Sequence, residues 1–368
     1  MRAGVLVDTQ LKAFVAEGVI ASEKPLDDGQ IQPASMDVRL GAHAYRIQAS
    51  VLPMRGETVE EAIKPLIMYD FSLSKQPRLL ERGSIYMIKL QEGLKLPKGV
   101  SGIASPKSST GRLDVFVRLL TDGGEVFDRV PDGYEGPLWL EVMPLTFPIK
   151  VRAGDRMLQL RLRSGETLVN DVALRALNAQ TPLLHRRACD EGPTTIDEGL
   201  WISIDLQHGS GNGVIGYRAK AHTQPVDLGK IGQHNWQTFW EPIPLTADQP
   251  LILYPEEFYI FASLEQVTVP PGYSAELVAY DTRVGELRLH YAGFFDPGWG
   301  MVNGKSEGTR AVLEVRAHDV PCVLRHGQRL GRFVYETLSE APEKLYGQEI
   351  GSNYSGQGLK LAKYFTMD

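Results

Sequence analysis

Leu140-Glu141-Val142 occurs a second time in this chain as Leu313-Glu314-Val315, at an offset of 173 residues (314 − 141). The residues that follow each copy keep this offset: Pro148 with Pro321, Arg152 with Arg325, Gly154 with Gly327 and Arg156 with Arg329. So do four upstream pairs: Pro77 with Pro250, Tyr86 with Tyr259, Pro97 with Pro270 and Gly99 with Gly272. A constant offset over about 80 residues indicates a duplicated unit.

The two copies differ in their polar residues. The first copy contains Ser108-Ser109-Thr110-Gly111-Arg112, and the second has Asp281-Thr282-Arg283-Val284-Gly285 at the same offset. This difference predicts one working half and one supporting half, with the working site in the first copy.

The length and composition fit two soluble globular domains. The chain has 368 residues, of which 43% are hydrophobic and 23% are charged. We predict domains at 1–190 and 191–368, with the mixed polar stretch 169–194 as the linker. The pattern of short strands separated by 37 Gly and 23 Pro predicts an all-β fold, a sandwich or barrel with a few short helices.

The charge and the cysteine content exclude several classes of protein. A net charge of −6 argues against a nucleic-acid binder. The two cysteines, Cys189 and Cys322, cannot form a disulfide scaffold or a paired-cysteine metal site. No apolar run reaches the ~20 residues of a membrane span, and the first residues do not read as a signal peptide. We therefore expect a cytoplasmic protein with no membrane partner.

Lys107 to Arg112 form the first candidate site. Two adjacent hydroxyls, a glycine and two flanking cations can bind phosphate oxygens. A polar turn on a solvated edge explains the short motif equally well.

Glu141 is the second candidate, because it lies in an otherwise apolar strand. Partial burial would raise its proton affinity and make it a general base, with Arg112 or Arg129 keeping it ionised. It could also be an outward residue of an alternating strand. Since Glu314 is present in the other copy, a role in the fold that both copies share stays open.

Other catalytic motifs are absent from the sequence. None of the eight histidines begins a His-x-Glu, and no Pro-Cys-x-x-Cys occurs, which excludes the signature of the zinc nucleobase deaminases. There is no Walker loop and no Gly-x-Gly-x-x-Gly after a strand. Hydrolysis would therefore use a water that a side chain activates.

Four stretches resemble the dCTP deaminase branch of the trimeric dUTPase superfamily. Residues 31–41 are similar to its N-terminal signature, and 108–112 resemble its Ser-Ser-Leu-Ala-Arg motif. Residues 129–141 resemble its Arg-Ile-Asp-Pro-Gly-Trp…Val-Leu-Glu segment, which carries the catalytic glutamate, and 354–358 resemble its closing Tyr-x-x-Gln-x-Gly segment. The Asp-Pro-Gly-Trp and Leu-Glu-Val of the second half mark it as a diverged relative. The whole chain resembles the long, internally duplicated form.

The resemblance implies two tandem distorted jelly rolls, trimeric symmetry with a homo-oligomer, and deamination of dCTP to dUTP and ammonia, which supplies dUTP for dTTP synthesis. It implies Mg²⁺ on the triphosphate, no protein metal ligand and no zinc. Its catalytic residues would be Glu141, Ser108 and Arg112. Its substrate-binding residues would be Lys107, Ser109, Thr110, Gly111, Arg129, Asp132, Trp139, Leu140, Tyr354 and Gln357.

Other functions remain open at this point. A dUTP diphosphatase, or a bifunctional enzyme that continues from dCTP to dUMP, is an alternative on the same fold. A non-catalytic sensor that binds dCTP, dTTP or dUTP belongs to another class, and a purely structural β-protein would bind no nucleotide. Because the closing segment follows the second copy, it either crosses to the first copy's site, in its own chain or a neighbouring one, or has another role.

Overall fold

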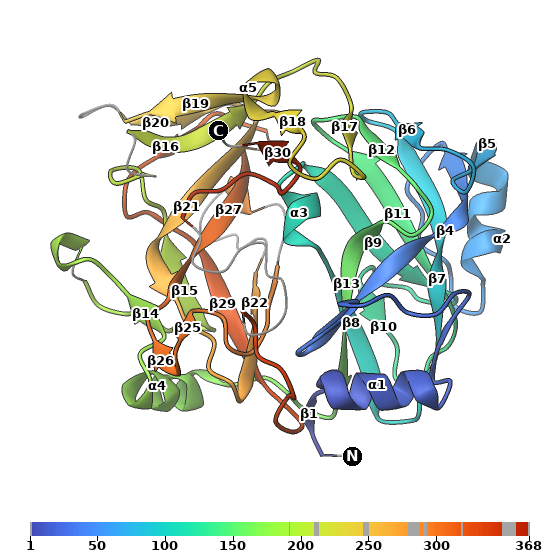
Figure 1. The fold of residues 1–368 in the computed structure, drawn as a ribbon, viewed down its shortest axis with the longest axis horizontal. Coiled ribbons are helices and arrows are strands. Elements are labelled where there is room, and N and C mark those ends of the chain that lie inside the picture. Colours follow the sequence, from blue (N-terminus) through green and yellow to red (C-terminus); the bar gives the residue numbers. More distant parts are fainter. Residues whose placement is uncertain are drawn as a thin grey trace.

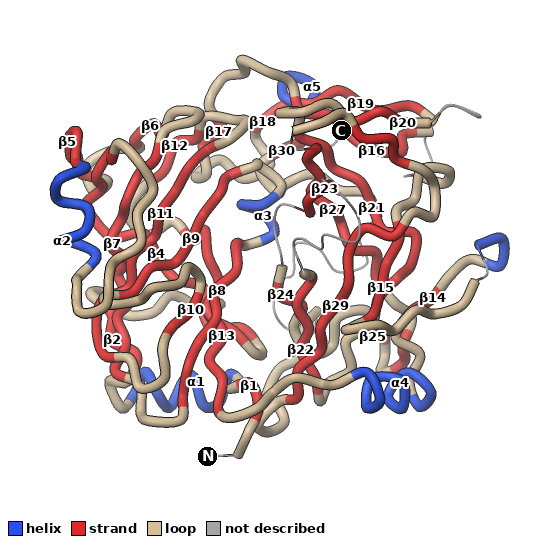
Figure 2. The backbone as a smooth tube through the Cα atoms, turned by 180° about the vertical axis from the view of Figure 1, so that it is seen from behind, coloured by secondary structure: helices blue, strands red, loops and turns tan. Residues whose placement is uncertain are grey.

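The computed structural model describes residues 2–190, 192–209, 213–245, 250–278, 287–289, 293–317, 319–347 and 358–366. Two β-rich halves lie side by side, with the short helix α3 at their boundary (Figure 1). The view from behind shows strands dominating both halves, with α3 at the centre and the other helices at the periphery (Figure 2). The prediction of an all-β fold is confirmed. No helix among the described residues is long and apolar enough to cross a membrane.

The helices are few and short. They are α1 (Asp8–Ala16), α2 (Val59–Ile63), α3 (Ser108–Gly111), α4 (Asp171–Gln180), α5 (Trp236–Phe239) and the 3-10 turns η1 (Lys64–Leu66) and η2 (Ala188–Asp190).

The first half contains thirteen described strands: β1 (Gly4–Val5), β2 (Ile20–Ser22), β3 (Ile31–Gln32), β4 (Ser35–Ile47), β5 (Ile67–Ser72), β6 (Arg78–Leu80), β7 (Ile85–Lys95), β8 (Val100–Pro106), β9 (Val115–Thr121), β10 (Arg129–Val130), β11 (Glu135–Pro144), β12 (Ile149–Val151) and β13 (Arg156–Ser164). Their main sheet has the order β10-β8-β13-β4-β7-β11-β9, and β6 pairs with β12 in a smaller one.

The described strands of the second half follow: β14 (Leu184–His185), β15 (Leu200–Ser203), β16 (Val214–Ala219), β17 (Val226–Asp227), β18 (His234–Asn235), β19 (Trp240–Pro244), β20 (Leu251–Leu253), β21 (Phe258–Val267), β22 (Tyr273–Leu277), β23 (Leu287–Leu289), β24 (Phe294–Phe295), β25 (Met301–Val302), β26 (Lys305–Ser306), β27 (Thr309–Ala317), β28 (Cys322–Leu324), β29 (Arg329–Thr337) and β30 (Phe365–Thr366). They form sheets with the orders β19-β16-β21-β27-β23 and β15-β29-β22-β24, together with shorter pairs.

The strands repeat with the offset seen in the sequence. β7 and β21 begin 173 residues apart (258 − 85), as do β12 and β28 (322 − 149) and β13 and β29 (329 − 156). Their pairing repeats as well, because β7 pairs antiparallel with β11 and β21 pairs antiparallel with β27. The duplication is therefore present in the backbone as well as in the sequence.

The region between the halves is more ordered than a linker. α4 lies inside the stretch 169–194, and its Leu174 and Leu177 are buried in the core of the second half together with Leu183. Leu168 forms an isolated bridge to Glu336 of the second half. The structure thus attaches the segment from about residue 168 to the second half, ahead of the predicted boundary at 190.

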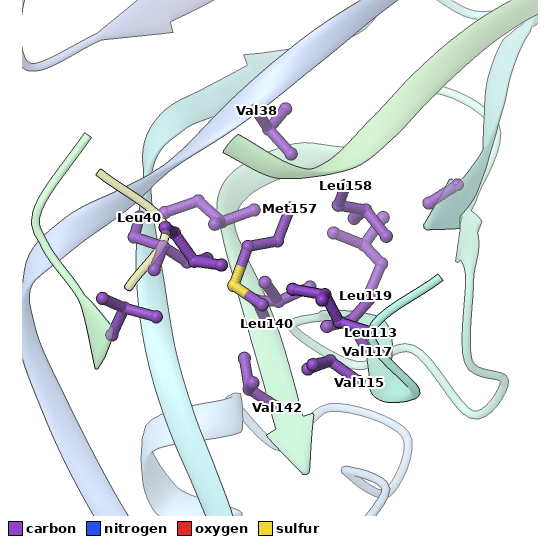
Figure 3. Packing of buried hydrophobic residues seen from close by; sticks show 14 of the residues in the cluster. Val38, Leu40, Leu113, Val115, Val117, Leu119, Leu140, Val142, Met157 and Leu158 are labelled. Carbon is purple, nitrogen blue, oxygen red and sulfur yellow. The ribbon is translucent and has the colours of Figure 1, made fainter. Parts of the chain in front are cut away.

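The pleat of β11 explains where Glu141 lies. Leu138, Leu140 and Val142 alternate with Trp139 and Glu141, so these two sets lie on opposite faces of the sheet. The first set belongs to the main hydrophobic core, in which Figure 3 shows Leu140 and Val142. Trp139 belongs to a small separate cluster, which also includes residues of α2. Glu141 therefore lies on the outer, α2-covered face of its sheet.

The equivalent face of β27 packs against the first half. Ala311, Leu313 and Val315 fill the core of the second half. On the opposite face, Val312 joins the core of the first half, and the neighbouring Glu314 and Arg316 form ion pairs with first-half residues. The two copies of the same strand thus present their second face to different partners.

An aromatic cluster completes the contact between the halves. The ring centroid of Phe147 lies 5.7 Å from that of Phe239, 5.2 Å from Trp240 and 6.4 Å from Phe365. Phe365 belongs to β30, which pairs in parallel with β18. The end of the described chain therefore helps to fill the core of the first half.

Buried ion pairs cross the same boundary. Arg316 Nη2 donates to Asp114 Oδ2 over 2.7 Å and to Thr146 Oγ1 over 3.1 Å. The side chains of Arg316 and Asp114 are 7% and 0% exposed. Removing one member of such a pair strands the other charge in a low-dielectric environment.

We expect Asp114→Ala to lower the free energy of unfolding by about 3–5 kcal/mol, because the Arg316 guanidinium loses its buried counter-charge. Adding Arg316→Met should recover part of that loss. Thermal and denaturant unfolding would measure both. Arg218→Ala, which breaks a half-exposed pair with Glu241, is the control and should cost only about 0–1 kcal/mol. An Asp114→Ala protein as stable as the control would contradict a supporting role for the pair.

Candidate active site

A cavity of about 500 Å³ lies between the two halves. This volume is within the usual range for small-molecule sites. Its first-half lining includes Asp37, Lys107, Ser108, Ser109, Arg112 and Arg156. Its second-half lining includes Phe294, Phe295, Asp296, Trp299, Glu314, Tyr346, Lys363 and Tyr364. Neither half makes this site alone.

The turn α3 presents the first-half residues. The carbonyl oxygen of Lys107 accepts hydrogen bonds from the backbone N–H groups of Thr110 and Gly111, at 2.8 and 2.9 Å. The Thr110 hydroxyl donates to the carbonyl oxygen of Met157 over 2.9 Å. These bonds fix the turn, and Ser108 and Ser109 line the cavity. Thr110 and Gly111, which were predicted to bind substrate, hold the turn and are not among the cavity-lining residues.

Arg112 and Glu314 meet across the boundary. Arg112 Nε lies 3.8 Å from Glu314 Oε1, and the two side chains are 3% and 6% exposed. Burial raises the pKa of Glu314 to about 7, and the Arg112 guanidinium opposes that rise. A carboxyl group with this pKa can both accept and release a proton near neutral pH.

Cations gather at another part of the cavity. Lys107 Nζ forms an ion pair with Asp37 Oδ2, and Arg156 Nη1 lies 3.7 Å from the same oxygen. The pKa of Lys363 is lowered, first by burial and next by the charge of Lys107. Arg156 also pairs with Asp27, and Asp155 acts on Lys363, so carboxylates balance part of this charge. The three cations nevertheless offer charged donors to an anionic ligand.

Aromatic rings line a further wall. The ring centroids of Phe295 and Trp299 are 5.0 Å apart, and those of Trp299 and Tyr346 are 4.9 Å apart. Asp296 is buried within this wall, with Oδ1 lying 3.5 Å from Arg161 Nη2. Burial raises the pKa of Asp296, against the opposing effect of Arg161. The cavity thus combines a cationic part, an apolar part and a carboxyl–guanidinium pair.

The structure does not bring Glu141 to Ser108 and Arg112. Glu141 Oε1 accepts a 2.9 Å hydrogen bond from the Ser50 hydroxyl, in the segment that leads to α2. Burial raises its pKa, while that hydrogen bond and Arg118 lower it. The prediction that these three residues share one site is therefore corrected, because the pleat of β11 turns Glu141 to the α2-covered face. Glu314, its equivalent, occupies the place beside Arg112.

Four other predicted binding residues lie outside the cavity lining. Trp139 and Leu140 are core residues, 3% and 0% exposed. Both carboxylate oxygens of Asp132 accept from the N–H of Gly99, at 3.0 and 2.9 Å, so this side chain braces a turn. Arg129 is exposed on β10.

The predicted closing residues Tyr354 and Gln357 lie outside the described residues. The segment that follows them, 358–366, returns to the first half of its own chain, where the Lys360 carbonyl oxygen accepts a 3.0 Å hydrogen bond from Arg112. Lys363 and Tyr364 of this segment line the cavity.

Sequence reasoning missed several second-half residues, although a signal was present. Asp296-Pro297-Gly298-Trp299 matches the order Asp-Pro-Gly-Trp better than Pro131-Asp132-Gly133 does, and it precedes Glu314 in the chain. The motif residues are therefore divided between the copies: the first keeps Ser-Ser-x-x-Arg and the second keeps Asp-Pro-Gly-Trp with the glutamate.

Comparison with known families settles the relationship. Residues 2–166 match the model of the 2'-deoxycytidine 5'-triphosphate deaminase (DCD) N-terminal domain. Residues 170–365 match the model of the corresponding C-terminal domain. The chain belongs to the dCTP deaminase family. The resemblance seen in the sequence is confirmed.

Individual relatives support the family. The chain is 34% identical to a "dCTP deaminase, dUMP-forming" of Leifsonia xyli over 119 residues, and 34% identical to one of Thermobifida fusca over 115 residues. These alignments cover 31% and 30% of this chain and 55% of each relative, about half of the relatives' length. A crystal structure of 2'-deoxycytidine 5'-triphosphate deaminase from Agrobacterium tumefaciens superposes with a TM-score of 0.87 and 46% identity, covering 93% of this chain and 100% of that one.

The raised pKa of Glu314 predicts a pH-dependent stability. Between its ordinary pKa of 4.5 and about 7, the folded protein holds a proton on Glu314 that the unfolded chain releases. The free energy of unfolding from this group therefore falls as pH rises through that window, by at most about 3 kcal/mol. We expect Glu314→Gln to remove this loss, so that its stability relative to the natural protein increases from pH 5 to pH 8.

Denaturant unfolding at several pH values would measure this difference. Glu125→Gln, at an exposed position, is the control and should follow the natural protein at every pH. A difference between Glu314→Gln and the natural protein that does not change with pH would show that the Glu314 carboxyl is not perturbed.

Proposed function

We propose that this chain hydrolyses dCTP to dUTP and ammonia in the cavity between its halves, with Glu314 as the general base and acid. The observation that carries the proposal is the buried Arg112–Glu314 pair, which is built from both copies and opens onto the cavity. Family membership supports the same chemistry, and the two relatives described above carry the name "dCTP deaminase, dUMP-forming".

The chemistry follows from the placement of the two groups. The Glu314 carboxylate takes a proton from a water, whose oxygen attacks C4 of cytosine. The same carboxyl then delivers a proton to the amino nitrogen, which leaves as ammonia. With a pKa of about 7, Glu314 can perform both transfers near neutral pH. Arg112 holds the carboxyl group on the cavity side, and Ser108 offers a hydroxyl to the water or the base.

The rest of the cavity matches the rest of the nucleotide. Lys107, Arg156 and Lys363 offer charge-assisted hydrogen bonds to the triphosphate. Mg²⁺ carried by the triphosphate would offset its remaining charge through oxygen ligands and water. Asp296 is placed to accept a hydrogen bond from a sugar hydroxyl beside the aromatic wall.

Three further parts of the proposal come from the sequence alone. The enzyme needs Mg²⁺ but no zinc at its catalytic site, it forms a homo-oligomer with trimeric symmetry, and it is located in the cytoplasm.

We expect Glu314→Gln to lower kcat for dCTP deamination by at least about 100-fold, because an amide cannot transfer the protons. Glu141→Gln is the matched control, at the equivalent strand position on the α2-covered face, and should keep most of the activity. This expectation reverses the assignment made from the sequence. The loss of cytosine absorbance and the release of ammonia would measure turnover.

An equal loss in both variants would contradict the assignment of Glu314. Chromatography of the nucleotide product would separate two outcomes on the same fold: dUTP supports deamination alone, and dUMP with pyrophosphate would show that hydrolysis continues.

Lys363→Ala should raise KM for dCTP by about tenfold or more, because one charged hydrogen bond to the triphosphate is lost. Lys230→Ala, at an exposed position outside the cavity lining, is the control. Steady-state kinetics at fixed free Mg²⁺ would show the difference. An unchanged KM in the Lys363 variant would remove this lysine from the triphosphate site.

A further inference from the structure

A second group of chemically reactive side chains lies in the second half, away from the cavity lining. Cys189 and Asp190 belong to η2, Asp205 and His208 follow β15, and His326 precedes β29. None of the five lines the cavity described above. No established or proposed step of deamination uses them.

Three of these residues are spaced like metal ligands. Cys189 Sγ lies 3.7 Å from His208 Nε2, and Asp190 Oδ2 lies 3.7 Å from the other ring nitrogen, His208 Nδ1. One ligand atom from each of the three residues lies within 4.8 Å of the other two. Tetrahedral coordination at bond lengths of 2.0–2.3 Å places ligand atoms about 3.3–3.8 Å apart. The Cys189–His208 Nε2 distance falls in this range, and a rotation of the Asp190 side chain from the Nδ1 side toward Nε2 would bring the three ligands onto one ion.

Asp205 fixes the imidazole of His208. Its Oδ1 lies 3.1 Å from His208 Nδ1 and also accepts from the backbone N–H of Gln207, at 3.0 Å, and of His208, at 2.9 Å. Its other oxygen is paired with Arg310, so the carboxylate is ionised and fully buried. An ionised acceptor keeps the proton on Nδ1 and leaves the Nε2 lone pair facing Cys189. A carboxylate behind a histidine is the usual support of a metal-bound imidazole.

Asp190 is a buried carboxylate that the protein leaves unsatisfied. Its side chain is 6% exposed, and among the described residues its buried Oδ2 has no hydrogen-bond partner. His326 Nε2 lies 3.6 Å from Oδ1, beyond hydrogen-bond distance. Because His326 Nδ1 accepts the N–H of Leu206 over 3.1 Å, a neutral His326 carries its proton on Nε2, toward Asp190. A buried anionic oxygen without a partner is costly, and a cation at this position would remove the cost.

A hydrogen-bond network alone explains only part of this arrangement. It accounts for Asp205, whose oxygens are all satisfied. It also accommodates the Cys189 thiol, which can donate to His208 Nε2. It does not account for the unsatisfied Asp190 Oδ2, and a bound metal ion does.

We propose that Cys189, Asp190 and His208 bind a divalent transition-metal ion, Zn²⁺ by the chemistry of its ligands, with Asp205 and His326 as positioning residues. Thiolate, imidazole and carboxylate are the ligands that Zn²⁺ takes in proteins. Mg²⁺ and Ca²⁺ prefer oxygen ligands alone. The thiol gives up its proton to solvent when the ion binds. Cys189 is exposed, so the ion can enter from solvent, and the fourth position is left for water.

The test uses the full chain after treatment with a chelator. Zn²⁺ would be titrated in competition with a chromophoric chelator, and Co²⁺ would be added separately to detect the charge-transfer band of a cobalt–thiolate bond. The proposal expects one Zn²⁺ per chain and a cobalt–thiolate band.

The variants assign the ligands. Cys189→Ala should lose the band and bind Zn²⁺ at least about tenfold more weakly, and His208→Ala should show the same weakening. Cys322→Ala, which removes the other cysteine, is the matched control and should behave like the natural protein. Because Cys189 is exposed, its substitution leaves the fold intact, and unchanged thermal unfolding without metal would verify this.

Asp205→Asn tests the positioning role. It should keep the cobalt–thiolate band but bind Zn²⁺ about 10–100-fold more weakly, because the histidine loses its ionised acceptor. The proposal is overturned if the natural protein binds no Zn²⁺, if Cys189→Ala binds it as tightly as the natural protein, or if the band is lost in Cys322→Ala.

Discussion

The contact of β27 with the first half is the constraint on which the rest of the molecule depends. One face of this strand belongs to the core of the second half. Its other face carries Val312 into the first core, Glu314 to Arg112 and Arg316 to Asp114. A single strand therefore contributes to packing, to a buried ion pair and to the reactive group of the cavity. A shift of its register by one residue would exchange the two faces and abolish all three.

The duplication explains why the site belongs to neither copy. Two similar units that meet through different surfaces form a heterologous contact, in which one unit supplies one surface and the other unit supplies another. Here the first copy supplies α3 and the second supplies the glutamate strand. The equivalent face of β11 in the first copy is covered by α2 and Ser50, so Glu141 is held in another environment. The two glutamates share a position in the repeat but have different neighbours.

The sequence predicted the fold better than the site, for a physical reason. Repeated spacing and strand alternation are local properties, and they correctly indicated the duplication and the all-β class. The turn carrying Ser108, Ser109 and Arg112 was also predicted correctly as part of the site, because its residues are contiguous in the chain. The partner of Arg112 depends on how two whole sheets pack, and no spacing within one copy encodes that packing. The intact Asp-Pro-Gly-Trp of the second copy was the available sign, since it marks the strand bearing Glu314. The cluster of Cys189 and His208 had no such sign, because folding alone brings its members together.

The route of the chain after the second half has a consequence for how the protein is made. Leu359, Leu361 and Phe365 are buried in the core of the first half. They leave the ribosome after both sheets have been synthesised, so the first half has to wait with part of its apolar interior uncovered. Newly made chains are therefore prone to associate with one another during this interval, and the cavity between the halves is complete only when this segment has docked.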